Sequence, residues 1–472
     1  MTTVTPALID GEEVTTSTSA EVTSPYDGRT VGVVPVCGPA EIDRAVAVAL
    51  DRHRAGAPPT HERAAVLDRV AAALEERVEE FARSISEESA KPITTATVEA
   101  KRAIDTVRFS AAAARTFTGE MVPMDASAVG AGKLGYVRRV PIGVIGAISP
   151  FNFPLNLVCH KIAPAVAAGC PVVLKPASAT PLTALRIARL FEECGLPPGW
   201  INVVTAPGSV ANRLVEHPDV AMITFTGSPE VGWGIRERAP RKKVGLELGN
   251  NAPVIVCEDA DWQAAAEKIG VAGYSYSGQT CISVQRVYVH RRHHEEFVEA
   301  LADRVSRLKV GDPADPETDL SALISDSASD RVQGVIDEAA GAGGRIVTGG
   351  GRDGAVLEPT VVDGLEPEMS LCHTEVFGPV VGVAVFDDLQ DAIDISNDTR
   401  YGLQAGIFTR DLTEALWAVE QLDFGGVLVN EVPTWRTDQM PYGGVRDSGN
   451  TREGPAYAVD EMTERRTIVI QG

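Results

Sequence analysis

The chain has 472 residues, of which 44% are hydrophobic and 23% are charged, a composition typical of ordinary globular proteins. A chain of this length exceeds the size at which one hydrophobic core usually stops growing, so we expect two or three domains. The formal net charge of −22 opposes binding to nucleic acid or to an anionic membrane, because both partners need basic patches.

No run of about 18 consecutive apolar residues occurs, and the first residues lack the basic start and apolar stretch of a signal peptide. These absences predict a soluble, cytoplasmic protein. The seven cysteines are scattered and include no Cys-x-x-Cys pair, which argues against a disulfide framework and against a zinc site, so we expect no bound metal. We interpret six of them as small buried hydrophobes, whereas Cys281 stands among small polar residues as a candidate nucleophile.

Ala, Glu, Arg and Leu recur at helical spacing from Glu41 to about Phe117 and predict helices there. Proline and glycine then separate short β-branched runs that predict strands, each followed by a helix. The predicted strands cover 140–148, 172–174, 201–204 and 222–225, and the helices cover 157–168, 181–194, 209–216 and 229–238. This alternation predicts right-handed crossovers and a parallel sheet covered on both faces, which is a doubly wound nucleotide-binding pattern.

The alternation restarts after Glu247 and predicts a second α/β unit that continues to about Gly444. Its first elements are strands at 253–256 and 286–289 and helices at 262–275 and 294–308. Two strand-like pieces, 133–139 and 465–470, lie outside both units. Because exposed strand edges need a partner or protection, these pieces favour an oligomer.

Two short segments carry the strongest functional signal: Leu-Glu-Leu-Gly-Asn at 246–250 and Gly-Gln-Thr-Cys-Ile-Ser at 278–283. The first supplies a carboxylate beside glycine, and the second supplies a thiol among small polar neighbours. At this separation they resemble the NAD(P)-dependent aldehyde dehydrogenase superfamily. Further matches follow in family order at 149–154, 175–178, 225–228, 375–379 and 441–444.

The resemblance implies an aldehyde dehydrogenase-like α/β fold with three parts. A Rossmann-type doubly wound parallel sheet would form the dinucleotide-binding domain from residues 1–120 and 141–249. Residues 250–445 would form the catalytic domain. Segments 121–140 and 446–472 would form a small oligomerisation sheet that pairs with a neighbouring subunit, as a homodimer or a homotetramer.

Cys281 is the predicted nucleophile, and its attack on an aldehyde would give a thiohemiacetal whose oxygen carries negative charge. Free cysteine has a pKa near ~8.5, so the thiolate needs local stabilisation at neutral pH. Asn152, in a proline-constrained turn after a strand, is the candidate donor for the oxyanion together with the Cys281 backbone amide. Glu247 is expected to take a proton from the water that hydrolyses the thioester left after hydride transfer.

Glu247 also separates two kinds of relative, because aldehyde dehydrogenases that pass the acyl group to coenzyme A generally lack this base. Its presence favours a free carboxylic acid as product. The alternatives are a coenzyme A-acylating enzyme, a thiol esterase, or a catalytically silent structural protein on the same scaffold. The silent protein would require the loss of Cys281, Glu247 or Asn152, and all three are present.

The predicted cofactor is NAD or NADP, although no Gly-x-Gly-x-x-Gly segment occurs at a strand–helix junction. Instead, residues 227–232 open a helix whose amides and dipole can receive pyrophosphate. Many NAD-preferring relatives carry glutamate where this chain has Ser178, and a serine would not repel a 2′-phosphate, so we expect NADP to be accepted. The cofactor residues implied by the resemblance are Ile148, Ser149, Pro150, Phe151, Lys175, Ser178, Gly208, Phe225, Thr226, Gly227, Ser228, Val231, Leu248, Glu375 and Phe377.

The substrate is the least constrained prediction. Residues 434–444 and 452–458 resemble the lactaldehyde and non-phosphorylating glyceraldehyde-3-phosphate branch, which includes enzymes for phosphonoacetaldehyde and sulfolactaldehyde. Arg436 in this loop and Arg108 in the helix before the oxyanion turn are candidate contacts for an anionic group, since a guanidinium suits carboxylate, phosphonate or sulfonate. His160, on a predicted helix, is interpreted as a packing or capping residue rather than a partner of the nucleophile.

Overall fold

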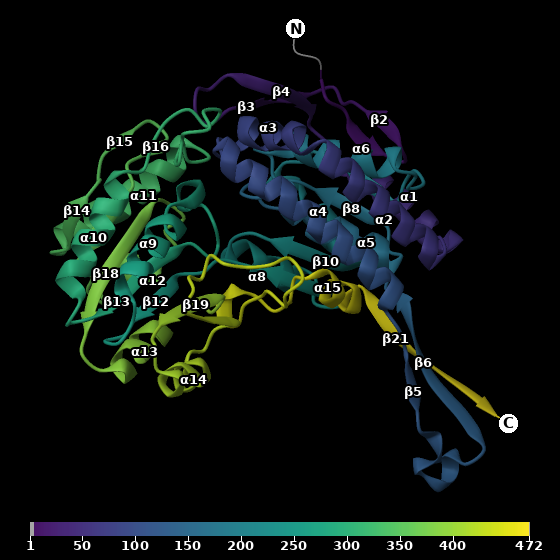
Figure 1. The fold of residues 1–472 in the computed structure, drawn as a ribbon. Helices are drawn as coiled ribbons and strands as arrows, with labels where there is room; N and C mark the ends of the chain where they lie inside the picture. The colour runs from purple at the N-terminus through teal and green to yellow at the C-terminus, as the bar shows by residue number, and fades with distance from the viewer. Residues whose placement is uncertain (1–3, 472) are drawn as a thin grey trace.

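The computed structural model describes residues 4–471. The first three residues of the predicted segment 1–120 and the last residue of the predicted segment 446–472 therefore lie outside the described residues. Two seven-stranded sheets, each covered by helices, form the body, and a thin arm of three strands projects from it (Figure 1). Within residues 4–471, none of the helices has the length and apolar character needed to cross a bilayer.

Four helices occupy the region where helical spacing begins at Glu41, and this prediction is confirmed. Proline marks the N-terminus of three of these helices, because it donates no backbone hydrogen bond and disfavours helical conformation in the residue before it. Pro39 begins the first helix, and Pro59 and Pro92 precede the second and the fourth. The helices are α1 (Pro39–Ala55), α2 (Thr60–Glu76), α3 (Val78–Ser89) and α4 (Ile93–Thr116).

The first sheet has the strand order β11-β10-β7-β8-β9-β1-β2. Its first five strands are parallel, as predicted, and β1 and β2 add an antiparallel edge. The strands are β11 (Lys243–Glu247), β10 (Val220–Thr226), β7 (Val144–Ile148), β8 (Val172–Lys175), β9 (Ile201–Val203), β1 (Ala7–Ile9) and β2 (Glu12–Val14). The connecting helices are α5 (Asn156–Ala168), α6 (Pro181–Glu193), α7 (Asn212–Glu216) and α8 (Pro229–Arg238).

Three predicted elements differ in detail from the structure. The predicted strand 140–148 is two strands, because Gly143 has φ +136° and the chain leaves one sheet and enters another there. The predicted helix 209–216 is a 3₁₀ turn at Gly208–Val210 followed by the short α7. The predicted helix 262–275 ends at Ala272, just before Gly273 packs against the side chain of Val381.

The second sheet has the order β14-β17-β18-β13-β12-β19-β20, and all its pairs are parallel except β14 with β17. Its strands are β14 (Arg345–Thr348), β17 (Thr360–Asp363), β18 (Val380–Phe386), β13 (Val284–His290), β12 (Ala252–Val256), β19 (Gln404–Phe408) and β20 (Gly426–Val429). Its helices are α9 (Trp262–Ala272), α10 (His294–Ser306), α11 (Asp326–Gly341), α12 (Ser370–His373), α13 (Leu389–Asn397) and α14 (Leu412–Gln421).

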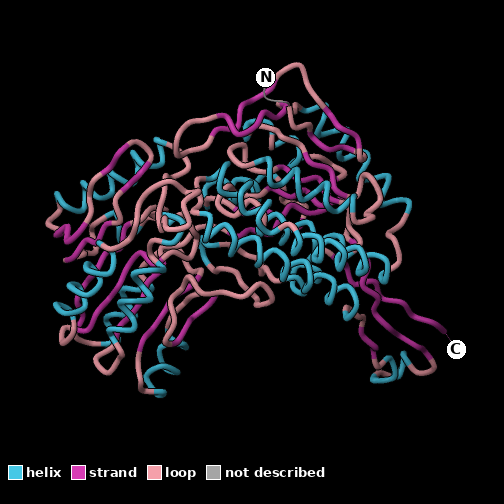
Figure 2. Tube along the Cα trace, turned by 45° about the horizontal axis from the view of Figure 1, so that its top comes forward, coloured by secondary structure: helices cyan, strands magenta, loops and turns pink. Residues whose placement is uncertain are grey.

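The arm consists of β5 (Glu120–Val122), β6 (Lys133–Pro141) and β21 (Thr463–Gln471) in the order β21-β6-β5, and it projects away from the two α/β units in both views (Figures 1 and 2). The prediction that residues 133–139 and 465–470 form strands outside both α/β units is confirmed. Leu134, Val469 and Ile470 on these strands are exposed. Pairing of this arm with another subunit stays a prediction. The remaining elements are β3 (Ser19–Thr23) with β4 (Thr30–Pro35), β15 (Arg352–Asp353) with β16 (Val356–Leu357), and α15 (Pro455–Glu461).

Candidate active site

A cleft of about 900 Å³ opens at the carboxyl ends of β7, β8 and β10 and at the N-terminus of α8. Ligands bind at this edge of open parallel sheets because the loops after neighbouring strands diverge there. Asn152 and Cys281 line the cleft, and Ser178 does not, being exposed beside the lining residue Ala177. The other predicted cofactor residues all line it: Ile148, Ser149, Pro150, Phe151, Lys175, Gly208, Phe225, Thr226, Gly227, Ser228, Val231, Leu248, Glu375 and Phe377.

The polar groups of this cleft fit a dinucleotide. Lys175 is buried, its Nζ donates to the Pro176 carbonyl oxygen at 2.9 Å, and burial lowers its pKa to about 8. Glu375 accepts a hydrogen bond from the Asn250 amide at 3.0 Å, and burial raises its pKa to about 8. The buried Ser149 hydroxyl has no partner within residues 4–471. A cation, a carboxyl and an unpaired hydroxyl that line one cleft suit phosphate and ribose groups.

The loop that carries Cys281 is held in an unusual backbone conformation. Tyr276 and Ser277 have φ of +50° and +53°, a region that L-residues rarely adopt and that the surrounding structure must enforce. Ser277 Oγ donates to the Ser321 carbonyl oxygen at 2.7 Å, and Gln279 Oε1 accepts from the Ile324 amide at 2.9 Å. These buried bonds fix the chain on either side of Gly278 and so fix the direction in which Cys281 points.

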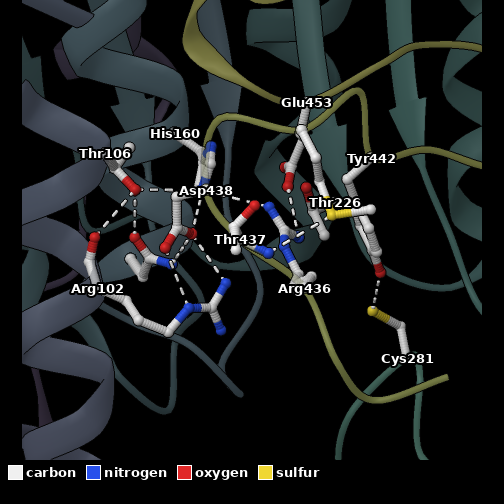
Figure 3. Close-up of polar contacts among 12 residues, drawn as sticks. Arg102, Thr106, His160, Thr226, Cys281, Arg436, Thr437, Asp438, Tyr442 and Glu453 are labelled. Carbon is white, nitrogen blue, oxygen red and sulfur yellow. Dashed lines mark hydrogen bonds and ion pairs between the residues drawn. The ribbon is translucent and has the colours of Figure 1, made fainter. Parts of the chain in front are cut away.

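The sulfur of Cys281 lies 2.9 Å from the hydroxyl oxygen of Tyr442 (Figure 3). Burial raises the pKa of Cys281 to about 12, and the hydrogen bond with Tyr442 acts in the opposite direction. The other cysteines form no pair with it and are free. Cys281 is thus a single thiol at the wall of the cleft whose ionisation depends on its hydrogen-bond donors.

Asn152 lies against the same loop. Its Nδ2 donates to the Gln279 carbonyl oxygen at 3.0 Å, and its buried Oδ1 has no partner among the described residues. The predicted role of this amide as an oxyanion donor together with the Cys281 backbone amide stays a prediction. A side-chain amide carries two hydrogens, so one remains for an oxygen in the cleft.

Lys91 and Glu99 support Asn152 from behind, and the sequence analysis missed both. Lys91 forms a fully buried ion pair with Glu99, and its Nζ donates to the Asn152 carbonyl oxygen at 2.6 Å. Glu99 accepts the amides of Leu155 at 2.9 Å and Asn156 at 3.1 Å, which start α5. No spacing rule identifies these residues, because each is an ordinary charged residue in a helical region.

Glu247 ends β11 and is buried. Neither of its carboxylate oxygens has a hydrogen-bond partner within residues 4–471, and a side chain at Gly443 would meet one of them at 2.8 Å. Burial and the negative charge of Glu453 raise the pKa of Glu247 well above its ordinary value, while Arg436 and Lys161 lower it. Glu247 lies beside Gly443 as Cys281 lies beside Tyr442, so the two predicted catalytic residues converge on adjacent positions of one loop.

Arg436 is the centre of a second buried network in the same loop (Figure 3). Its guanidinium lies 3.3 Å from Glu453 and 3.3 Å from His160 Nε2, and it stacks 3.8 Å from the centroid of the Tyr442 ring. Burial lowers the pKa of Arg436, but Glu453, Tyr442 and Asp438 together outweigh burial, so the pKa is raised. A permanent cation therefore lies one aromatic ring away from the Cys281 sulfur.

Comparison with known proteins agrees with this geometry. The model of the aldehyde dehydrogenase family matches residues 13–468. The chain belongs to this family. It is an NAD(P)-dependent aldehyde dehydrogenase.

Among its relatives, a 3-sulfolactaldehyde dehydrogenase of Priestia aryabhattai is 43% identical over 98% of this chain and 97% of its own length. Aldehyde dehydrogenase 21 of Physcomitrella patens, solved with its reaction product succinate, is 39% identical with a TM-score of 0.96, over 100% of this chain and 99% of its own. The NADP-dependent glyceraldehyde-3-phosphate dehydrogenase of Bacillus halodurans, solved with NADP, is 36% identical with a TM-score of 0.97, over 99% of both chains.

The second predicted substrate residue, Arg108, is not brought to the enzyme's cleft. It lies on the exposed face of α4 and pairs with Glu75 at 2.6 Å. Arg102, six residues earlier and so turned by about 120° around the helix axis, faces inward and binds Asp438 through two bonds of 3.1 and 2.8 Å. The helical phase of the buried Glu99 and Thr106 would have favoured Arg102 over Arg108.

His160 is buried on α5, as expected of a packing residue, and it also belongs to a polar network. Its Nε2 lies 3.0 Å from Asp438 and contacts Arg436 (Figure 3). Burial alone would raise the pKa of Asp438, but His160 and Arg102 hold that pKa well below its usual range. Asp438 therefore stays charged and links α4 and α5 to the loop that carries Arg436 and Tyr442.

Proposed function

We propose that the enzyme oxidises a small aldehyde with an anionic group to the free carboxylic acid, and that it accepts NADP as well as NAD. The observation that carries the proposal is the buried guanidinium of Arg436. It shares Tyr442 with the nucleophile, and its Nε has no partner among the described residues. A buried unpaired donor costs free energy, and a carboxylate, phosphonate or sulfonate oxygen would remove that cost.

The reaction follows from the positions of three side chains. The sulfur of Cys281 adds to the aldehyde carbon, and the free N–H of Asn152 donates to the oxygen that becomes negative. A bound nicotinamide dinucleotide supplies the acceptor for the hydride. Glu247 then takes a proton from a water molecule, which attacks the thioester carbon and releases the acid and the Cys281 thiolate.

Glu247 supports water rather than coenzyme A as the acyl acceptor. Its carboxylate oxygens have no hydrogen-bond partner within residues 4–471, and its raised pKa makes it a stronger base than an ordinary glutamate once it is ionised. A general base of this kind is needed for water and is not needed for a thiol acceptor.

The names of the relatives support an anionic group on the substrate. Sulfolactaldehyde carries a sulfonate, succinate a second carboxylate and glyceraldehyde-3-phosphate a phosphate. For the cofactor, Lys175 lines the cleft and has no ion pair within residues 4–471, and the residue three positions after it is Ser178 rather than a glutamate. A relative solved with NADP agrees with this arrangement.

Initial rates on a panel of neutral and anionic aldehydes, each with NAD and with NADP, test the proposal. We expect the highest kcat/KM on an anionic aldehyde, and we expect Arg436→Ala to raise KM for that aldehyde about 10- to 100-fold more than for propanal. Arg291→Ala, which removes a surface partner of Asp387, is the matched control and should change neither. Equal effects of Arg436→Ala on anionic and neutral aldehydes would rule out the anionic substrate.

A further inference from the structure

We propose that Tyr442 is a catalytic residue of this enzyme: its phenol donates a hydrogen bond that stabilises the Cys281 thiolate, and Arg436, stacked on the phenol ring, strengthens that donor. The proposal rests on the proposed function in taking Cys281 as the nucleophile. It adds a residue to the chemistry and gives Arg436 a second task that does not depend on the charge of the substrate.

The first step is the contact itself. Tyr442 Oη lies 2.9 Å from Cys281 Sγ, short for a hydrogen bond to sulfur, and Tyr442 is buried. When Cys281 is a thiol, either group can donate. When it is a thiolate, the sulfur can only accept, so the phenol must donate. Hydrogen bonds to an ionised acceptor are about twice as strong as neutral ones, so this contact favours the thiolate over the thiol.

The second step is that the phenol keeps its proton. Burial raises the pKa of Tyr442 well above its ordinary value, and the neighbouring sulfur raises it further. Ionisation therefore takes place at sulfur alone: Cys281 releases its proton to water and becomes a thiolate, and Tyr442 retains the proton that it shares with the sulfur. No second acid or base is consumed.

The third step is the position of Arg436. A guanidinium 3.8 Å from the ring centroid lies within the range of a cation–π contact and withdraws electron density from the ring. This makes the hydroxyl a better donor. The Glu453 carboxylate at 3.3 Å holds Arg436 in this position.

The fourth step is that the backbone fixes the ring. The Tyr442 amide donates to the Met440 carbonyl oxygen at 2.8 Å, and the Tyr442 carbonyl oxygen accepts from the Glu453 amide at 2.6 Å. Ile282, Leu403 and Met440 pack around the ring and Cys281. The hydroxyl is therefore preorganised at the sulfur, and a phenylalanine would fill the same space without a donor.

Alkylation of Cys281 by iodoacetamide, followed across pH in the free enzyme, tests the proposal without aldehyde or cofactor. We expect Tyr442→Phe to move the inflection of the rate upward by about 1–2 pH units, equivalent to a 10- to 100-fold smaller thiolate population at neutral pH. A thiolate without its donor is intrinsically more reactive, so the alkylation rate itself should fall only about 3- to 10-fold. Glu247, Glu375, Glu453 and Arg436, the charged groups around the sulfur, are unchanged in this variant.

Tyr274→Phe is the matched control, because it also removes a fully buried hydroxyl, one that donates to the Thr360 carbonyl oxygen at 2.9 Å. It should leave the inflection where it is in the wild type. Arg436→Gln should raise the inflection when Tyr442 is present and add little in the Tyr442→Phe background, as expected for residues that act through each other.

An unmoved inflection in Tyr442→Phe would overturn the proposal, and so would equal effects of Arg436→Gln in the two backgrounds. If Tyr442→Phe does not fold, an unchanged inflection in Arg436→Gln alone would overturn the coupling. The outcome is separate from that of the proposed function. A wild type that oxidises no aldehyde but shows these shifts would sink the proposed function and leave the role of Tyr442 standing.

Discussion

Two buried ion pairs contact residues of the candidate active site: Lys91–Glu99 contacts Asn152, and Arg436–Glu453 contacts Tyr442. They differ in how many of their polar atoms have hydrogen-bond partners. Lys91 and Glu99 bind each other, the Asn152 carbonyl and the two amides that begin α5. Lys91 also lies 3.8 Å from the ring centroid of Phe153. In the pair of Arg436 with Glu453, the Arg436 Nε and the Glu453 Oε1 are buried without partners, as are both oxygens of the nearby Glu247.

We infer from this difference that one ion pair has a structural role and the other takes part in the reaction. A buried unpaired polar group costs about 1–3 kcal/mol, so a folded protein keeps one where a ligand or water will complete it. The Lys91–Glu99 pair has no such vacancy and fixes the position of Asn152. The Arg436–Glu453–Glu247 group has four buried atoms without partners among the described residues, and we propose that substrate and water complete them.

Glu247→Gln should have the largest effect. Removing the base leaves hydride transfer possible and slows hydrolysis of the thioester by about 10²- to 10⁴-fold. Rapid-mixing kinetics should show a burst of about one reduced cofactor per site followed by this slow rate. A linear trace near the wild-type rate would contradict the role of Glu247.

The role of Glu247 also predicts the direction in which the hydrolysis rate of the wild type changes with pH. Because burial and Glu453 raise the pKa of Glu247 well above 4.5, the ionised base is scarce in acid, and the rate of hydrolysis should rise as pH increases through the raised pKa. Glu247→Gln should lack this rise in its slow phase. A rise of the same size in the variant would assign it to another group.

Lys91→Met probes the supporting pair. It leaves the Glu99 carboxylate buried without its cation, and we expect the free energy of unfolding to fall by about 3–5 kcal/mol. Urea unfolding measures this change. Arg213→Met, which removes the cation of an exposed bidentate pair with Asp43, is the control and should cost less than about 1 kcal/mol. Similar costs in both variants would remove the distinction between the two ion pairs.

Many of the elements and the candidate nucleophile could be predicted from the sequence because they depend on local rules. Helical spacing located the region of α1 to α4, and β-branched runs between glycine and proline located β7, β8, β9, β10, β12 and β13. The motif around Cys281 led to a thiol that lines the cleft. The break between β6 and β7 at Gly143 could not be predicted from the sequence, because it depends on which sheet each strand joins.

The supporting residues could not be predicted, because their partners are distant in the chain. Asp438 joins Arg102, Asn156 and His160 only after α4, α5 and the loop at 436–442 have packed together. Arg108, predicted as a substrate contact, is on the exposed face of α4, and helical phase alone would have favoured Arg102 as the inward-facing residue. No local rule predicts the contact between Tyr442 and Cys281, because these residues are 161 positions apart in the chain.

Asn152→Ala should distinguish a catalytic role of Asn152 from a role in positioning the loop that carries Cys281. Loss of an oxyanion donor should lower kcat by about 10²- to 10³-fold. Alkylation of Cys281 in the absence of aldehyde should stay near the wild-type rate, because no oxyanion forms in that reaction. A parallel fall in both rates would show that Asn152 acts by holding the Gln279–Cys281 loop in place rather than by donating to the substrate.

The smallest effect is expected at Lys175, which lines the cleft and has no carboxylate partner among the described residues. Its pKa is lowered to about 8 by burial, so the ammonium is present below pH 8 and is lost as pH rises through that value. If it binds a 2′-phosphate, the ratio of NADP to NAD affinity should fall above pH 8, and Lys175→Met should weaken NADP binding about 10- to 100-fold while affecting NAD less. Titration of protein fluorescence with each cofactor measures the dissociation constants of NADP and NAD.

A ratio of NADP to NAD affinity that is independent of pH in the wild type and unchanged in Lys175→Met would place the 2′-phosphate contact elsewhere. Arg238, which lines the same cleft, would be the next residue to vary.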